Sequence, residues 1–246
     1  MTSLAQAAPL RWAARFPVTL CYVLGLAAVA FFQRGLSDAR GQQLVSQTST
    51  NLRNLAEGRW LTLLESAFVT QEDPSRIWVW LPGFACLLAL GEWIWRSRRL
   101  AGAIVLSHVG GTALVALGLV VALRLGWAES SVVDDDDVGV SYASMGAFGA
   151  LIGAVPRALR LPWAAWWLAA AALALWRDRD FTSAGHLVSL CLGLMAGAWF
   201  ARGGERTRWT PLMLCLAAVA FVFSFDVLVD VRAFGFDPQA PAASPP

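Results

Sequence analysis

The chain contains no lysine, so all 19 of its basic side chains are arginines, and charged residues make up only 15% of its 246 positions. The net charge of +2 is small and dispersed, which argues against a nucleic-acid partner. There are four cysteines without CxxC spacing and only two histidines. We therefore expect no disulfide framework, no metal and no other cofactor.

Apolar residues, by contrast, are abundant. They make up 57% of the chain, mean hydropathy is +0.56, and the charges cluster between long uncharged runs. This pattern predicts an all-α polytopic membrane protein, because each run is long enough to cross a hydrocarbon core of roughly 30 Å. Seven spans are predicted, the fifth being the shortest, at residues 16–32, 77–95, 101–123, 138–155, 161–176, 183–201 and 211–231.

Arginine is concentrated at alternate ends of these spans, at Arg11, Arg15, Arg96, Arg98, Arg99, Arg157, Arg160, Arg202, Arg206 and Arg208. The positive-inside rule then places the N-terminus in the cytoplasm and the C-terminus outside. The Arg-, Ala- and Gly-rich composition favours a bacterial cell (inner) membrane. We expect residues 1–15 to form a cytoplasmic segment and 232–246 a disordered outer tail, while residues 58–69 lie in the outer interface.

Few polar side chains fall inside the spans, and such residues carry a functional hypothesis by default. Ser141 and His186 each lie about 3–4 residues, or roughly 5–6 Å of helix rise, below the outer ends of their spans. They share one level, whereas His108 lies roughly 12 Å from the inner end of the third span and is expected to be a poor partner for Ser141.

A serine in the first turn of a helix lies next to unpaired backbone N–H groups that stabilise an oxyanion, and a histidine at that level can act as its base. Gly139 would let the backbone approach a substrate closely, and Asp137 is a candidate N-cap. The alternative is simple helix packing, because Gly146, Gly149 and nearby alanines form small-residue stripes.

Together these residues resemble the rhomboid family of intramembrane serine proteases. That family has a GxSG motif at the outer end of its fourth span, glycines five and eight residues after the serine, and a histidine in the sixth span followed by small residues three and seven positions later. The matching residues here are Gly139, Ser141, Gly146, Gly149, His186, Ser189 and Gly193. The resemblance covers roughly residues 59–197.

The resemblance implies a six-helix rhomboid-like core at residues 16–201, followed by a seventh helix at 209–231. It also implies a Ser141–His186 dyad that cleaves transmembrane segments of other membrane proteins near the outer face of the lipid bilayer. Gly139 and Tyr142 would shape the oxyanion site. Gly146, Gly149, Ser189 and Gly193 would pack the two catalytic helices against each other.

Alternatives remain at this point. Ser144 offers a second register for the nucleophile, but it lacks the glycine two residues earlier and the five/eight glycine spacing. Tyr142 replaces the family's glycine after the nucleophile, and residues 76–80 lack its HxxxN motif. These differences favour a second hypothesis, a catalytically silent rhomboid-like protein that binds membrane-protein clients. A small transporter using His108, Asp226 and Asp230 is a third.

Overall fold

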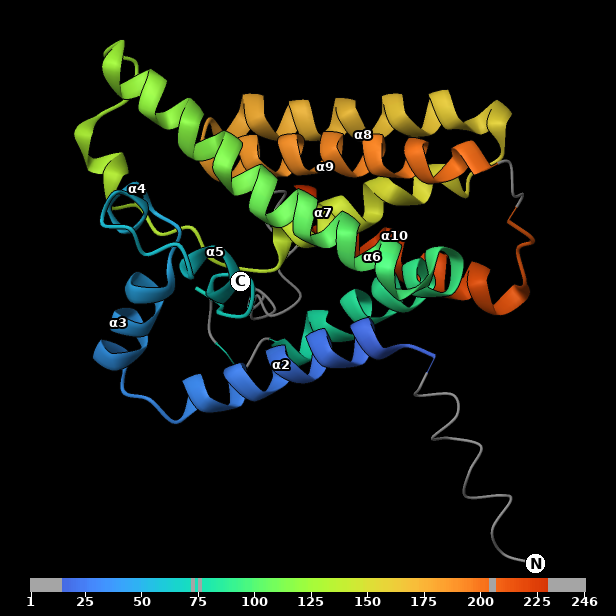
Figure 1. Cartoon of the computed structure of the whole chain (residues 1–246), viewed down its shortest axis with the longest axis horizontal. Coiled ribbons are helices and arrows are strands. Elements are labelled where there is room, and N and C mark those ends of the chain that lie inside the picture. Colours follow the sequence, from blue (N-terminus) through green and yellow to red (C-terminus); the bar gives the residue numbers. More distant parts are fainter. Residues whose placement is uncertain (1–14, 72–73, 75–76, 204–206, 230–246) are drawn as a thin grey trace, which may run out of the picture.

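The computed structural model describes residues 15–71, 74, 77–203 and 207–229, so the predicted N-terminal segment and outer tail lie almost wholly outside the described residues. All regular elements in these ranges are helical (Figure 1). They are α2 (Pro17–Arg34), α3 (Asp38–Thr48), α4 (Leu52–Ala56), α5 (Thr62–Glu65), α6 (Ile77–Arg124), α7 (Ser141–Ala150), α8 (Arg157–Asp178), α9 (Phe181–Phe200) and α10 (Pro211–Val229), with 3-10 turns η2 (Ser130–Val133), η3 (Leu151–Gly153) and η4 (Ala201–Gly203).

Five helices are long and apolar enough to cross a membrane, which makes the chain a helical, multi-pass membrane protein. One of them, α6, has 48 residues and is divided at Arg96, whose backbone has φ 62° and ψ 163°. A continuous helix of that length would be about 72 Å long, more than twice the hydrocarbon thickness. The chain reverses at the division (Figure 1), so the two arms match the predicted second and third spans.

The predicted fourth and fifth spans differ from expectation in length. The fourth contains only the ten-residue α7 and the turn η3, while the fifth is the 22-residue α8, so the prediction that the fifth is shortest is wrong. Gly139, with φ +123°, precedes α7, and Pro156 follows η3. Both residues disfavour continuation of a helix, which confines α7 to a short segment. A total of seven spans stays a prediction.

The segment between α2 and α6 contains less regular helix than its apolar spacing suggests. Within residues 58–69 only α5 is α-helical, and the flanking backbone forms tight turns such as Ala67 N–H to the Leu64 carbonyl at 3.3 Å. Gly58, with φ +79°, begins this segment in a conformation that favours glycine. Trp60, Leu61 and Leu64 are nonetheless exposed, as expected for side chains at a membrane interface.

A buried carboxylate joins α2 to the first arm of α6. Glu92 accepts hydrogen bonds from the backbone N–H of Val18 at 3.0 Å and from the backbone N–H and hydroxyl of Thr19 at 2.9 and 2.7 Å. These N–H groups belong to the first turn of α2, where no intrahelical acceptor exists. Glu92, one of the few charges within the spans, therefore caps a helix.

Candidate functional site

Helix α7 lies at the centre of the helical bundle, packed against α9 and the second arm of α6 (Figure 1). Its contacts with α9 are made through glycines. A Cβ atom on Gly149 would lie 2.7 Å from the carbonyl oxygen of Leu190, and one on Gly193 would collide with the backbone of Gly146. The two backbones can approach this closely only because neither side presents a side chain.

The segment before α7 is anchored to the α3–α5 region by hydrogen bonds. The N–H of Gly139 donates to the carbonyl of Ser66 at 2.8 Å, and the N–H of Asp137 donates to the hydroxyl of Ser49 at 2.8 Å. Gly139 therefore has a positive φ and a committed N–H group. Its role in the structure is to position the start of α7 against Ser66.

Asp137 does not cap α7, contrary to prediction. The N-cap residue is Val140, which has no side chain able to cap, and the Asp137 carboxylate accepts instead from the hydroxyl of Thr50 at 3.3 Å. Burial raises the pKa of Asp137 to about 6, although the Thr50 hydrogen bond acts in the opposite direction. The first three N–H groups of α7 thus have no intrahelical acceptor and no side-chain cap.

Ser141 is the first residue of α7 and is partly exposed, while His186 lies buried in α9. The two residues thus lie on helices that pack against each other, α7 and α9. Within the described ranges, no hydrogen bond joins the Ser141 hydroxyl to the His186 ring, and the buried Nε2 of His186 has no hydrogen-bond partner. The predicted pair therefore shares a region without forming the contact that defines a dyad.

Tyr142 occupies the position beside His186. The two ring centroids are 5.9 Å apart with an interplanar angle of 88°, an edge-to-face contact. Tyr142 is only 2% exposed, and its ring covers Gly185, where any Cβ would collide with it. Tyr142 therefore brings an aromatic side chain of α7 into contact with His186.

His108 was predicted to be a poor partner for Ser141, and the structure places its ring next to Tyr142, the residue that follows Ser141. Its ring centroid lies 6.4 Å from that of Tyr142, so both histidines border the same tyrosine. The second arm of α6 runs diagonally across α9 (Figure 1). Counting residues along each span did not reveal that both histidines contact Tyr142, and the level of His108 relative to Ser141 stays a prediction.

Ser66 is a buried partner that sequence reasoning did not identify. Its hydroxyl lies 3.1 Å from Nε2 of His108, in a contact between the segment after α5 and the second arm of α6. Both residues are almost fully buried. Because Ser66 lies in a short irregular segment outside the predicted spans, no periodicity pointed to it.

The other two serines of the predicted site have structural partners. Ser144 is fully buried and its hydroxyl donates to the carbonyl of Val140 at 2.8 Å, within α7. Ser189 donates to the carbonyl of Ser107 at 3.0 Å and so links α9 to α6. Neither hydroxyl is aimed at a histidine in the part of the chain that the structure describes.

Several polar atoms near Tyr142 lack hydrogen-bond partners among the described residues. Besides His186 Nε2, they include the Tyr142 hydroxyl, His108 Nδ1, Ser107 Oγ and Thr112 Oγ1, all buried. Buried polar groups are normally satisfied by protein or by ordered water. The interior between α6 and α9 therefore has the capacity to bind polar atoms inside an otherwise apolar bundle.

The arrangement described so far defines a polytopic helical membrane protein with a buried, polar core of serine, tyrosine and histidine around a short central helix. A comparison with family profiles matches residues 11–207 to the family described as rhomboid-like protein. The chain belongs to this rhomboid-like family, as its motifs predicted. Neither the curated proteins nor the solved structures contain a match to it.

Proposed function

We propose that this chain is a rhomboid-like protein that binds transmembrane segments of other membrane proteins without cleaving them. The contact between Tyr142 and His186 carries this proposal. Successive residues of an α-helix are about 100° apart around its axis. Since Tyr142 points at His186, the preceding Ser141 points about 100° away from it, and Tyr142 is held in place by full burial.

A serine nucleophile needs a base within hydrogen-bonding reach, and a rotation of this size removes it. The oxyanion side is also depleted, because the Gly139 N–H is bonded to Ser66 and residues 76–80 contain neither His nor Asn. Loss of one oxyanion donor typically lowers a rate by about 100- to 1000-fold. These features together favour binding over turnover.

A Ser141–His186 protease is the second candidate, and a specific observation favours it. His186 has a buried Nε2 atom that is unpartnered within the described ranges, close to a helix start whose first N–H groups are uncapped. In this mechanism Ser141 attacks the carbonyl carbon of a substrate peptide bond while His186 accepts the serine proton. His186 then passes that proton to the amine that leaves as the C–N bond breaks, and water hydrolyses the resulting acyl-enzyme. Tyr142 would have to move away from His186 before reaction.

Fluorophosphonate labelling of the purified, folded full-length chain distinguishes the two candidates. We expect the wild-type protein and Ser141→Ala to label equally weakly, with Ser144→Ala as a matched serine control. Labelling of the wild type and of Ser144→Ala, lost in Ser141→Ala, would refute the silent function and establish the protease. Clients should co-purify with wild type and Ser141→Ala in equal amounts and uncut.

We further propose that the protein lies in a bacterial cell membrane with its N-terminus in the cytoplasm and α3–α5 at the outer face. The alternation of arginine clusters supports this orientation. Cysteine-accessibility labelling of intact cells tests it. A single cysteine introduced at Asp38 in α3 should react with a membrane-impermeant reagent, and one introduced at Arg98 should not, in a background where the native cysteines are replaced by serine.

A further inference from the structure

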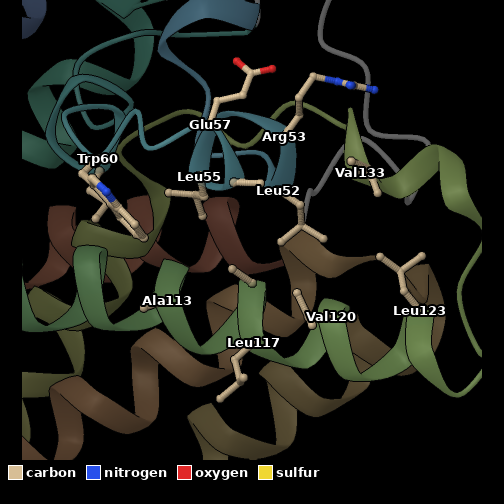
Figure 2. Close-up of a pocket in the computed structure, with 13 residues that line it drawn as sticks. Leu52, Arg53, Leu55, Glu57, Trp60, Ala113, Leu117, Val120, Leu123 and Val133 are labelled. Carbon is tan, nitrogen blue, oxygen red and sulfur yellow. The ribbon is translucent and has the colours of Figure 1, made fainter.

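An apolar groove of about 700 Å³ lies between the α4–α5 segment and the outer half of α6, away from the Tyr142 site. Leucine, valine, alanine and tryptophan side chains form most of its walls (Figure 2). Arg53 and Glu57 stand along one edge and extend their charged ends away from the apolar wall. The groove thus combines an apolar interior with charged groups at one edge only.

The position of the groove relative to the membrane follows from its neighbours. Its α6 wall belongs to a membrane-spanning helix, and Trp60 of the opposite wall and Trp127 just beyond α6 are strongly exposed. Exposed tryptophans are typical of the membrane–water interface. Arg53 and Glu57 therefore lie at the level of the lipid headgroups, with the apolar walls beside the acyl region.

The volume decides between two occupants. One turn of an α-helix with side chains occupies roughly 400–600 Å³, so a transmembrane segment could place little more than one turn in the groove. Clefts of roughly 300–1,000 Å³ with apolar walls and a few polar groups are typical of small-molecule sites. A single lipid chain extending below a headgroup fits the shape better than a protein helix.

The charges at the edge select the headgroup. Arg53 forms an ion pair with Asp134, and Glu57 lies near it, which leaves one positive and two negative side chains. A phosphate would be bound by the Arg53 guanidinium, while the exposed carboxylate of Glu57 is available to a cationic hydrogen-bond donor. A primary ammonium supplies three such donors, and a quaternary ammonium supplies none.

We propose that this groove binds one phospholipid whose headgroup carries a phosphate and a primary ammonium, as in phosphatidylethanolamine. One of its two acyl chains lies along the α6 wall, its phosphate contacts Arg53 and its ammonium contacts Glu57. The site is separate from the Tyr142 region and does not depend on client binding. It would hold the α4–α5 segment against α6 in the outer leaflet.

Native mass spectrometry of the detergent-solubilised full-length chain tests the site with phosphatidylethanolamine, phosphatidylcholine and phosphatidylglycerol of identical acyl chains. Wild type should retain phosphatidylethanolamine preferentially. Glu57→Gln should reduce that preference over phosphatidylcholine by about fivefold, while Glu129→Gln, which alters an exposed carboxylate outside the groove, should not. These surface variants leave the apolar packing intact.

A bulky substitution that fills the groove tests whether the lipid's acyl chain binds there. Ala113→Trp should abolish retention of all three lipids, whereas Leu114→Trp, on the neighbouring α6 position outside the groove, should keep it. Equal retention of the ethanolamine and choline lipids by wild type would overturn the headgroup assignment. Retention by Ala113→Trp equal to that of Leu114→Trp would overturn the groove as the site.

Discussion

The ring of Tyr142 meets the ring of His186 edge-on, with centroids 5.9 Å apart, at the contact between α7 and α9. Tyr142 directly follows Ser141, and the function proposed above rests on this step of about 100° around the helix axis directing the serine away from the histidine. The contact also holds α7 against α9 next to Gly185. Tyr142 therefore contributes to helix packing and also carries the proposal that Ser141 is not a nucleophile.

Replacement of Tyr142 should therefore affect stability strongly. Tyr142→Ala removes a fully buried aromatic ring, and we expect it to lower the free energy of unfolding by about 3–5 kcal/mol. Tyr142→Phe keeps the ring and should remain within about 1 kcal/mol of wild type. Unfolding by sodium dodecyl sulfate in mixed micelles, followed by tryptophan fluorescence, measures both. An alanine variant as stable as the phenylalanine variant would contradict this packing.

Because α7 and α9 approach closely, we expect alanine substitutions of glycine to differ in their effect on stability according to whether the glycine lies in this interface. Gly193→Ala would place a methyl group against the backbone of Gly146, which should separate the helices and cost about 1–3 kcal/mol or more. Gly102→Ala, in an exposed part of α6 with no atom nearby, should be neutral or stabilising by up to about 1 kcal/mol. The same unfolding assay compares them, and equal effects would contradict the interface.

Glu92 is predicted to be essential for docking α2. Glu92→Ala leaves two backbone N–H groups and one hydroxyl without their acceptor, and we expect a loss of at least about 3 kcal/mol in unfolding free energy. Glu92→Gln, which keeps one oxygen acceptor, should lose less. Glu129→Ala, at an exposed site, is the control. Limited proteolysis after Arg34 should accelerate in Glu92→Ala and should not in Glu129→Ala.

The raised pKa of Asp137 predicts how the free energy of unfolding depends on pH. Burial raises its pKa to about 6, above the ordinary value of about 3.9 for an aspartate in an unfolded chain. The folded state therefore favours the protonated carboxyl, so this contribution to stability is complete below about pH 4 and is lost as the pH rises through about 6. Unfolding measured from pH 4 to pH 7 should show that fall, and Asp137→Asn should flatten it.

Asp134 supplies the control for that profile because its shift has the opposite sign. The Arg53 guanidinium lowers the pKa of Asp134, so its smaller, solvent-screened contribution is present at neutral pH and is lost on acidification. Asp134→Asn should therefore leave the fall between pH 4 and pH 6 in place. A profile that Asp137→Asn does not alter would show that another group titrates there.

The membrane-spanning segments could be predicted from the sequence because the thickness of a bilayer fixes how many consecutive apolar residues a crossing helix needs. The runs at residues 77–95 and 101–123 correspond to the two arms of α6, and those at 16–32 and 183–201 match α2 and α9 closely. The family could be predicted as well, because the spacing of Gly139, Ser141, Gly146, Gly149 and His186 is a property of the chain alone.

Contacts between side chains on different helices could not be predicted from the sequence in this way. The contact of His108 with Tyr142 depends on how α6 packs against α7, and the contact of His186 with Tyr142 depends on how α7 is rotated about its axis. The binding of Ser66 to His108 depends on how an irregular segment folds back over the helices. Tilt, rotation and the path of a loop arise from packing between segments distant in the chain, whereas span length and motif spacing arise from covalent order and the bilayer. The sequence therefore specifies the membrane-protein class and the rhomboid-like family, and packing around α7 brings Tyr142 into contact with His186.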